Sequence, residues 1–264
     1  MVFFDTHTHL DYLAQDLGLS ITQLVENARQ GNVDRILVVS VGAKNFDKVT
    51  ACSQAEPEHV VYGLGLHPLY IASHQYADLD LLEQRLLNRD KHCTAIAEIG
   101  LDKGVAEICT PELWQKQCEF LETQLSFAKR LDLPVNLHSR KTHDVLFPFL
   151  KKAQLSQCGV IHGFSGSYDQ AKRFVDLGYK IGVGGTITYA RANKTRETIR
   201  KLPLDSLVLE TDSPDMPVFG YQGEPNRSER LNVSFQALCD LRTEDPEQIA
   251  DVIWQTSEKL FWLD

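Results

Sequence analysis

Long apolar runs and paired cysteines are absent from this sequence of 264 residues. No stretch approaches the roughly 20 consecutive apolar residues that a membrane helix needs. The first residues, MVFFDTHTH, carry no basic segment and place Asp5 inside an apolar run, so we expect neither an export signal nor membrane association. The six cysteines form no CxxC pair, which in a chain of this length is typical of reduced thiols that pack in the interior. We therefore expect a cytoplasmic protein.

Positive charge is also scarce. The chain has 27 Lys and Arg against 36 Asp and Glu, a formal net charge of −9 at pH 7. A field of that sign repels nucleic acid and anionic lipid, which excludes broad electrostatic adhesion to either. A phosphate substrate would have to be attracted by local features of the surface.

The chain does contain a regular alternation of short β-branched runs and helical segments, and its hydrophobic fraction of 43% is ample for a large core. We expect eight strands, at residues 2–6, 35–42, 60–68, 94–102, 133–140, 159–166, 179–185 and 206–214. We expect helices at residues 21–29, 46–54, 79–88, 111–130, 143–152 and 168–177, and one or two more between residues 228 and 263.

This alternation predicts the fold. Near-continuous apolar strands separated by helices are typical of a parallel sheet that is covered on both faces. Eight such units, with no linker or repeat between them, predict a single α/β domain over residues 1–264, a TIM (β/α)8 barrel with extra C-terminal helices. The competing architecture is an open doubly wound sheet, which the strand count disfavours only in part.

Histidine and carboxylate side chains follow most of the expected strands. His7 and His9 stand two residues apart at the end of the first strand, so both imidazoles point to the same face. The ends of later strands carry His67, Glu98, His138, His162 and Asp212. In a barrel, all of these strand ends meet at one rim, where enzymes of this fold build their active sites. Even without His67, four histidines and two carboxylates suit one or two divalent ions, Zn²⁺ first with Mn²⁺, Fe²⁺ or Mg²⁺ as alternatives, and exceed what a single ion can use.

The histidines also have interpretations without a metal. His67 precedes Pro68 and can simply end a strand, or it can contact substrate. His138 and His162 each follow an apolar run, and each alone is typical of a buried histidine with a hydrogen-bond partner. The argument that these histidines bind a metal depends on their expected position together at one rim of the barrel.

The carboxylates have alternatives of the same kind. Glu98 interrupts an apolar strand, where an unpaired carboxylate is costly, so we expect it to pair with a cation or to bind a metal. Glu210 and Asp212 lie two residues apart and can share a face of the strand. In that arrangement one of them binds a metal while the other orients a ligand.

Six ordered segments, DTHTHLD, GLHP, EIGLD, NLHSR, IHGFSGS and LETDSP, resemble the motifs of the TatD family of metal-dependent nucleases within the amidohydrolase superfamily, with the greatest similarity to its YjjV branch. The resemblance extends from residue 5 to about residue 230. It implies two metal ions, one held by His7, His9, Glu98 and Asp212, the other held by His138 and His162 with Glu98 as a bridge. It also implies that His67 lies on the substrate side.

The chain departs from the family pattern at several places. Ala97 stands where the family usually has glycine, Lys103 where many members have tyrosine, and Gly163 where they have cysteine. After TDSP the chain reads DMPVFGYQGEPNRSERL, whereas in the usual arrangement RNEP closes this loop. These differences bear on substrate choice more than on metal binding.

Two adjacent ions lower the pKa of a bridging water and clamp both the attacking and the leaving oxygens of a phosphodiester. Glu98 and Asp212 are the candidate catalytic residues. The expected reaction is attack of metal-bound hydroxide on phosphorus, with Asp212 orienting the hydroxide and accepting its proton. His67 and Arg140 are candidate phosphate contacts, and Arg140 is equally compatible with a surface arginine at the start of a helix.

A weaker indication lies in the run GVGGTITYARANKTRETIRK, which contains three glycines and five cations, namely Gly182, Gly184, Gly185, Arg191, Lys194, Arg196, Arg200 and Lys201. A phosphate-binding loop is one interpretation. A tight turn followed by a solvated basic helix face is the favoured one. Asn226, Arg227 and Arg230, after the eighth strand, would extend a basic patch.

The favoured function is a divalent-metal-dependent hydrolase, a phosphodiesterase or deoxyribonuclease acting on nucleic acid or small nucleotide esters. The same metal barrel can hydrolyse C–N or carboxylic ester bonds, but such substrates have no need of Arg140 or of the cations at 191–201. A third hypothesis, a non-catalytic metal-binding or nucleic-acid partner protein, is disfavoured by Asp212 beside the candidate ligands. We expect no obligate protein partner.

Overall fold

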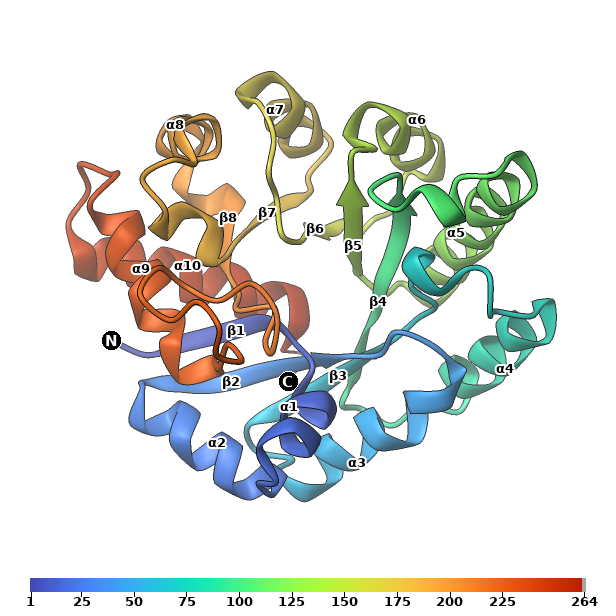
Figure 1. The fold of residues 1–264 in the computed structure, drawn as a ribbon, viewed down its shortest axis with the longest axis horizontal. Coiled ribbons are helices and arrows are strands. Elements are labelled where there is room, and N and C mark those ends of the chain that lie inside the picture. Colours follow the sequence, from blue (N-terminus) through green and yellow to red (C-terminus); the bar gives the residue numbers. More distant parts are fainter. Residues whose placement is uncertain (263–264) are drawn as a thin grey trace.

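The structure, a computed structural model that describes residues 1–262, contains eight parallel strands, each hydrogen-bonded to the next in chain order (Figure 1). The strands are β1 (Phe3–Thr8), β2 (Val33–Val39), β3 (Val60–Leu64), β4 (Cys93–Asp102), β5 (Val135–Arg140), β6 (Gly159–Ile161), β7 (Lys180–Val183) and β8 (Leu207–Leu209). The helices are α1 (Leu10–Leu17), α2 (Ile21–Gln30), α3 (Phe46–Ala55), α4 (Tyr76–Leu87), α5 (Pro111–Leu131), α6 (His143–Ala153), α7 (Tyr168–Asp176), α8 (Asn193–Lys201), α9 (Leu231–Cys239) and α10 (Pro246–Phe261). Figure 1 shows the helices around the outside of the strands, which confirms the predicted TIM barrel.

A seam between β8 and β1 closes the ring. Thr8 and Ser213 form a parallel bridge, and the Asp212 amide donates to the carbonyl of His7 at 2.9 Å. Lower in the seam, the Thr6 hydroxyl donates to the Leu209 carbonyl at 2.9 Å. These bonds extend the contact beyond the three residues of β8, and they bring the ends of the first and last strands together.

The barrel interior is filled by alternate residues of the strands, as the period of two requires. One buried cluster contains Phe4, Leu37, Val39, Val61, Ala95, Ala97, Val160 and Val208. Phe261 of α10 belongs to the same cluster and packs edge-on against Phe4, with ring centroids 6.4 Å apart. The C-terminal helix therefore covers the barrel end at which β1 begins, and the rim at the carboxyl ends of the strands stays available for a site.

Two local predictions are corrected. The expected strands at 159–166 and 206–214 are longer than β6 and β8, because the chain turns away from the ladder soon after each begins, and Gly163 and Asp212 adopt left-handed φ angles of 54° and 56°. The segment after His9, where we expected no helix before residue 21, is helix α1; its Leu10 and Leu13 are buried on one face.

The other expected helices are present, and the predicted C-terminal helices are α9 and α10. Residues 263 and 264, the end of the expected domain, lie outside the described residues. None of the described helices combines the length and the apolarity that a membrane span requires.

Candidate metal centre

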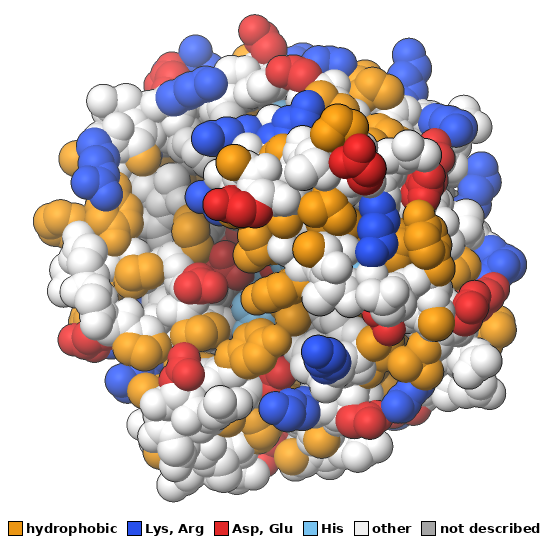
Figure 2. All heavy atoms as spheres, turned by 45° about the vertical axis from the view of Figure 1, so that its right-hand side comes forward, with side chains coloured by type: hydrophobic (Ala, Val, Ile, Leu, Met, Phe, Trp, Pro, Cys, Tyr) orange, Lys and Arg blue, Asp and Glu red, His pale blue; other side chains and the backbone are white. Residues whose placement is uncertain are grey.

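The strand ends form a pocket with a volume of about 710 Å³. Its lining contains most of the predicted site residues, namely His9, His67, Glu98, His138, Arg140, His162 and Asp212. His7 lies beneath them and is fully buried. Figure 2 shows the recess from outside, with acidic and histidine side chains at its floor. The structure thus brings together side chains from six different strand ends.

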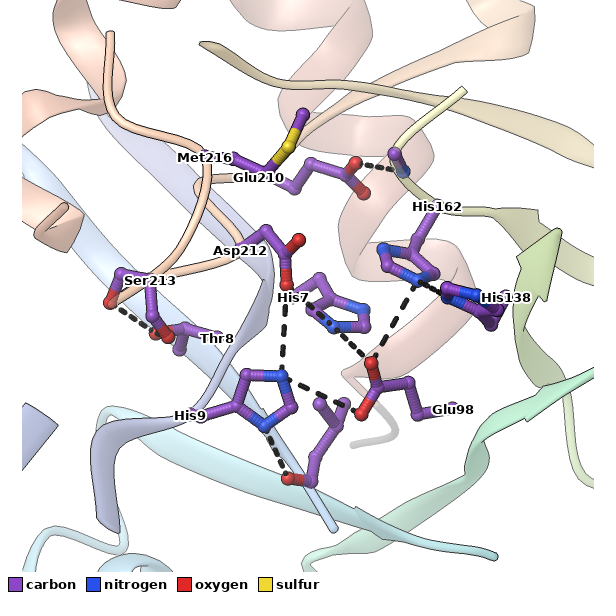
Figure 3. A network of polar contacts seen from close by, with 12 residues as sticks. His7, Thr8, His9, Glu98, His138, His162, Glu210, Asp212, Ser213 and Met216 are labelled. Carbon is purple, nitrogen blue, oxygen red and sulfur yellow. Dashed lines mark hydrogen bonds and ion pairs between the residues drawn. The ribbon is translucent and has the colours of Figure 1, made fainter. Parts of the chain in front are cut away.

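Glu98 reaches the pocket because β4 contains a bulge. Ala97 pairs with Asn136 and Ile99 with Leu137, so Glu98 is an extra residue that opposes none in β5. Its φ of 54° is left-handed, a conformation that is costly for a glutamate and that concentrates at functional sites. The bulge turns the carboxylate into the centre of the pocket, where it lies among the imidazoles (Figure 3).

His7 and His9 face the same two carboxylates. The Nε2 atom of His7 lies 3.3 Å from Asp212 Oδ1 and 3.6 Å from Glu98 Oε1. The Nε2 atom of His9 lies 3.6 Å from Asp212 Oδ1 and 3.5 Å from Glu98 Oε2. One donor atom from each of these four residues lies within 4.8 Å of the other three. The HxH spacing and the seam between β1 and β8 produce this quartet together.

Hydrogen bonds to Nδ1, on the side of each ring away from the carboxylates, determine which nitrogen of His7 and His9 carries a hydrogen. The Asn136 amide donates to the Thr6 carbonyl at 3.1 Å, so its oxygen faces His7 Nδ1, 2.8 Å away, and can only accept. The Val39 carbonyl accepts in the same way from His9 Nδ1 at 3.2 Å. Each Nδ1 therefore carries a hydrogen, and Nε2 is the nitrogen that faces the carboxylates. Asp212 and Glu98 raise the pKa of His7 and His9 against burial, so a metal that binds at Nε2 displaces a proton there.

His67 has the opposite arrangement. Its Nδ1 accepts a hydrogen bond from the Leu69 amide at 2.9 Å, so the ring hydrogen is on Nε2. That Nε2 donates to Glu98 Oε1 at 3.0 Å. Although donor atoms of His67, Glu98 and His138 lie within 4.8 Å of one another, His67 presents a hydrogen where a metal ligand needs a lone pair. Its geometry suits a hydrogen bond to an anion.

His138 and His162 occupy the other side of Glu98. The Nε2 atom of His138 donates to Asp102 Oδ2 at 2.9 Å, which leaves Nδ1 as its lone-pair nitrogen. This Nδ1 lies 3.3 Å from His162 Nε2, and His162 Nε2 lies 3.9 Å from Glu98 Oε1. The His162 ring also stacks on His7, with centroids 3.8 Å apart. Asp102 has no separate role in the sequence interpretation, although it is the last residue of the EIGLD segment.

Several buried polar atoms in the pocket have no hydrogen-bond partner. They are His7 Nε2, Glu98 Oε2 and His162 Nδ1. Unsatisfied buried polar atoms are rare because each costs about 1–3 kcal/mol. His7 Nε2 and Glu98 Oε2 point at the centre of the site, where a cation would satisfy both, so the residues fit a divalent ion.

The electrostatics of the pocket agree with a bound cation. Burial alone would raise the pKa of Glu98, but His67 and His9 outweigh it and hold this pKa well below the usual range. His7 and His9 likewise hold the pKa of Asp212 low against burial. Both carboxylates are thus ionised inside the protein. Buried charges of one sign require compensation by cations.

Glu210 lies below this site and does not join the quartet. It is completely buried, and its carboxylate accepts a hydrogen bond from the Gly163 amide. Burial raises its pKa to about 8. A side chain at Gly182 would lie 2.2 Å from Glu210 Oε2, so this glycine makes room for the carboxylate. Of the two acidic residues in LETD, Asp212 is the one beside the histidines.

Two departures from the family pattern have a structural context. Ala97 is buried beside Gly63 of the neighbouring strand, which pairs with Ala95; a side chain at Gly63 would lie 2.4 Å from the Ala97 methyl group. Lys103 is exposed, with its Nζ 4.1 Å from the centre of the Trp114 ring. The Ala97 methyl group therefore occupies space that Gly63 leaves free, and the Lys103 cation lies on an aromatic ring of α5.

Arg140 is exposed at the wall of the pocket. A side chain at Gly104 would lie 2.4 Å from Arg140 Nε, so a glycine provides the space that the arginine occupies. Within residues 1–262, Arg140 has no carboxylate within ion-pair distance. Its charge is therefore available to an anion in the pocket.

Most of the run of glycines and cations makes contacts within the protein. Gly185 allows close approach of the Met216 carbonyl, which would lie 2.4 Å from a side chain there. Arg200 and Lys201 pair with Glu197, and Arg196 donates to the Ile187 carbonyl. These observations support the favoured interpretation, a turn followed by a solvated helix face.

The expected extension of a basic patch is wrong. Asn226 is completely buried, and its amide donates to the carbonyls of Thr211 and Met216. Arg230 is buried and pairs with Glu224, and Arg227 lies 3.8 Å from Glu229. These polar groups hold the loop after β8 in place and offer no free positive charge.

Comparison with known proteins places this geometry in context. The family described as TatD related DNase matches residues 4–262. An uncharacterized metal-dependent hydrolase of Haemophilus influenzae is 61% identical over 99% of this chain and 100% of its own length. The metal-dependent hydrolase YjjV of Escherichia coli K12 is 47% identical over 98% of this chain and 97% of its own. The crystal structure of that YjjV superposes with a TM-score of 0.93, covering 99% of this chain and 98% of its own at 45% identity. The human deoxyribonuclease TATDN3 is 29% identical over 97% of this chain and 93% of its own.

Proposed function

The chain belongs to the TatD family and is a metal-dependent hydrolase, and from that premise we propose that it is a phosphodiesterase that cleaves nucleic acid or nucleotide esters. One observation carries the proposal. The pocket places an imidazole N–H, on His67, and a free guanidinium, on Arg140, around the same recess as the lone-pair nitrogens and carboxylates of the candidate metal centre. A phosphodiester needs both kinds of group, because it is an anion.

We propose two divalent ions, with Zn²⁺, Mn²⁺ and Mg²⁺ as candidates. His7, His9, Glu98 and Asp212 would hold the first ion, and His138, His162 and Glu98 the second. The hydrogen bonds behind the rings support this set, because they leave Nε2 of His7 and His9 and Nδ1 of His138 as the nitrogens that a metal can take. When bound, such ions lower the pKa of a coordinated water and neutralise charge on the phosphodiester.

The protein's own side chains then complete the reaction. His67 Nε2–H and Arg140 bind the non-bridging phosphate oxygens and orient the ester. Asp212, ionised and partly open to the pocket, accepts the proton of the attacking water as its oxygen bonds to phosphorus. As the ester bond breaks, the leaving oxygen takes up a proton from the solvent. Glu98 stays ionised between the two halves of the site. Its 3.0 Å contact with His67 Nε2 would give way when Glu98 binds the ions, which frees this N–H for the phosphate.

We also propose that the protein acts in the cytoplasm and needs no protein partner. All six cysteines lie in the described part of the chain, and all are free thiols. Reduced thiols are typical of that compartment.

The test is hydrolysis of single-stranded DNA and RNA, labelled at either end, by metal-free protein refilled with Mg²⁺, Mn²⁺ or Zn²⁺. We expect metal-dependent shortening that Asp212→Asn abolishes. Asp215→Asn is the matched control, since Asp215 lies in the same pocket but outside the proposed ligand set. Intact substrates with every metal, together with hydrolysis of a carboxylic ester or a C–N bond, would overturn the phosphodiesterase and favour the carbonyl substrate.

A further inference from the structure

The loop that follows β8 carries two exposed aromatic side chains, Phe219 and Tyr221. Phe219 is 63% exposed, the largest value among the described aromatic residues, and it lies in the loop that follows β8. Leaving a phenylalanine in water forfeits about 1.5–3 kcal/mol of burial. An exposed apolar side chain that joins others in one patch is typical of a surface that is covered by a ligand.

Phe219 is held in a defined position by the loop after β7. Its ring meets Tyr189 edge to face, with centroids 5.9 Å apart and planes at 89°. The Tyr189 hydroxyl donates to the Pro217 carbonyl at 2.7 Å, and the Phe219 amide donates to the Thr188 hydroxyl at 2.8 Å. The two rings are thus positioned before any ligand binds, which lowers the entropic cost of binding.

A cavity of about 270 Å³ lies beside these rings. It is lined by Thr186, Tyr189, Arg191, Ala192, Met216 and Pro217. Met216 also lines the metal pocket and is drawn beside Glu210 in Figure 3. A substrate whose scissile bond lies at the metal centre can therefore continue across Met216 into this cavity.

The cavity has a positive charge of its own. The guanidinium of Arg191 lies 5.1 Å from the centre of the Tyr189 ring. Among the cations at 191–201, Arg200 and Lys201 are neutralised by Glu197, whereas Arg191 forms no ion pair with any residue from 1 to 262. In a chain of net charge −9, an unpaired arginine beside aromatic rings is a local attractor for phosphate.

We propose that Tyr189, Arg191 and Phe219 form a base-stacking subsite for single-stranded nucleic acid, next to the metal centre. A base lies against the aromatic rings while Arg191 contacts a neighbouring phosphate, the combination that single-strand-binding proteins use. A paired base inside a duplex presents no free face to such rings, so the subsite selects unpaired strands or strand ends. The inference rests on the proposed phosphodiesterase and narrows its substrate to strands longer than the ester at the metal centre.

The experiment compares two substrates of the metal-loaded protein: bis(p-nitrophenyl) phosphate, which has no base, and a single-stranded DNA octamer. We expect Phe219→Ala to raise KM for the octamer about 5-fold or more, from the loss of one stacked base, with kcat little changed. Hydrolysis of the p-nitrophenyl ester should be unchanged. Phe219→Trp should restore the octamer KM, which a merely structural effect of the loop would not predict. Tyr76→Ala, which removes an exposed ring on α4, is the control.

Anisotropy of a labelled octamer separates this proposal from the proposed function. If no phosphodiester is cleaved but the octamer binds and Phe219→Ala weakens binding, the subsite stands and the phosphodiesterase fails. If the p-nitrophenyl ester is cleaved but octamer KM and binding are the same in wild type and Phe219→Ala, the subsite is overturned and the phosphodiesterase stands.

Discussion

The two halves of the pocket differ in how much negative charge each offers. On the β1 and β8 side, two imidazoles meet two carboxylates, with every nitrogen-to-oxygen distance between 3.3 and 3.6 Å. On the β5 and β6 side, His138 and His162 meet each other at 3.3 Å, and the carboxylate contact of His162 Nε2, to Glu98, is 3.9 Å. Affinity for a divalent cation rises with the charge of its ligands, so the first half is expected to bind its ion more tightly.

The halves also differ in what stands behind the rings. Neutral acceptors, the Asn136 amide and the Val39 carbonyl, orient His7 and His9. A buried carboxylate, Asp102, orients His138. The β5 and β6 side thus has fewer charged ligands but has a charged residue, Asp102, behind one of its ligands. The following experiments separate the effect of the ligands from the effect of the residues behind them.

The largest effect is expected from removing the residue that the halves share. Glu98→Gln keeps the shape of the side chain and removes its charge from both halves. We expect hydrolysis to fall by more than the roughly 10- to 100-fold that the loss of an outer partner of a metal ligand costs, together with loss of bound metal. Steady-state kinetics and elemental analysis measure both quantities. Wild-type metal content in the variant would show that Glu98 is not a ligand.

Single histidine substitutions compare the halves directly. His9→Ala should lower the affinity of the more tightly bound ion, whereas His162→Ala should leave that ion in place and remove the weaker one. Titration of metal-free protein by isothermal calorimetry measures the number and affinity of the ions. Equal loss of both ions in the two variants would contradict the proposed order.

Outer partners give a smaller effect that differs between the halves. Asn136→Ala should weaken the first ion, and Asp102→Ala the second, each by about 10- to 100-fold. Both residues are buried and lie outside the ligand quartet. The same calorimetric titration measures the metal affinity of both variants. If Asp102→Ala weakens only the first ion, the assignment of His138 is wrong.

The smallest effect on the metal centre is expected for a histidine outside both halves. His143, packed near Phe164 and Phe174, has its pKa lowered by burial from 6.5 to about 4. Because the unfolded chain takes up this proton first, folding stability is lost as pH falls from about 6.5 towards 4, by about 2 kcal/mol by pH 4.5. His143→Leu should remove that part of the acid destabilisation, measured by urea unfolding of metal-free protein at pH 7.5 and 4.5. An unchanged pH dependence would show that other groups cause it.

Much of this site was predictable because strand ends meet at one rim in a barrel. The spacing of His7 and His9 and the positions of Glu98, His138, His162 and Asp212 after apolar runs were enough to predict that they come together. Asn136 could also have been found, since it lies two residues before His138 and so shares its face of β5. Asp102 was harder, because its contact with His138 depends on the register between β4 and β5.

The pairing of cations, the burial of Asn226 and the lengths of β6 and β8 could not be predicted from the residue types alone. Cations look alike in a sequence whether they are free, like Arg191, or neutralised, like Arg200, since the partner is decided by side-chain placement. Asn226 looked like a surface residue and is buried, because the loop after β8 folds back over the Thr211 carbonyl. Strands β6 and β8 are short because residues that follow them, such as Asp212, adopt a positive φ angle. The residue type of an aspartate does not predict that conformation.

The bulge at Glu98 sets a condition for anyone who would transplant this centre into another barrel. On a regular strand, the glutamate would alternate with its neighbours between the two faces of the sheet. Its carboxylate would then point away from the copied histidines. A one-residue deletion in β4 would do the same to the native protein, since it would reverse the facing of each residue on one side of the cut. The inserted position is therefore as much a part of the donor template as the chemical identity of the residue that fills it.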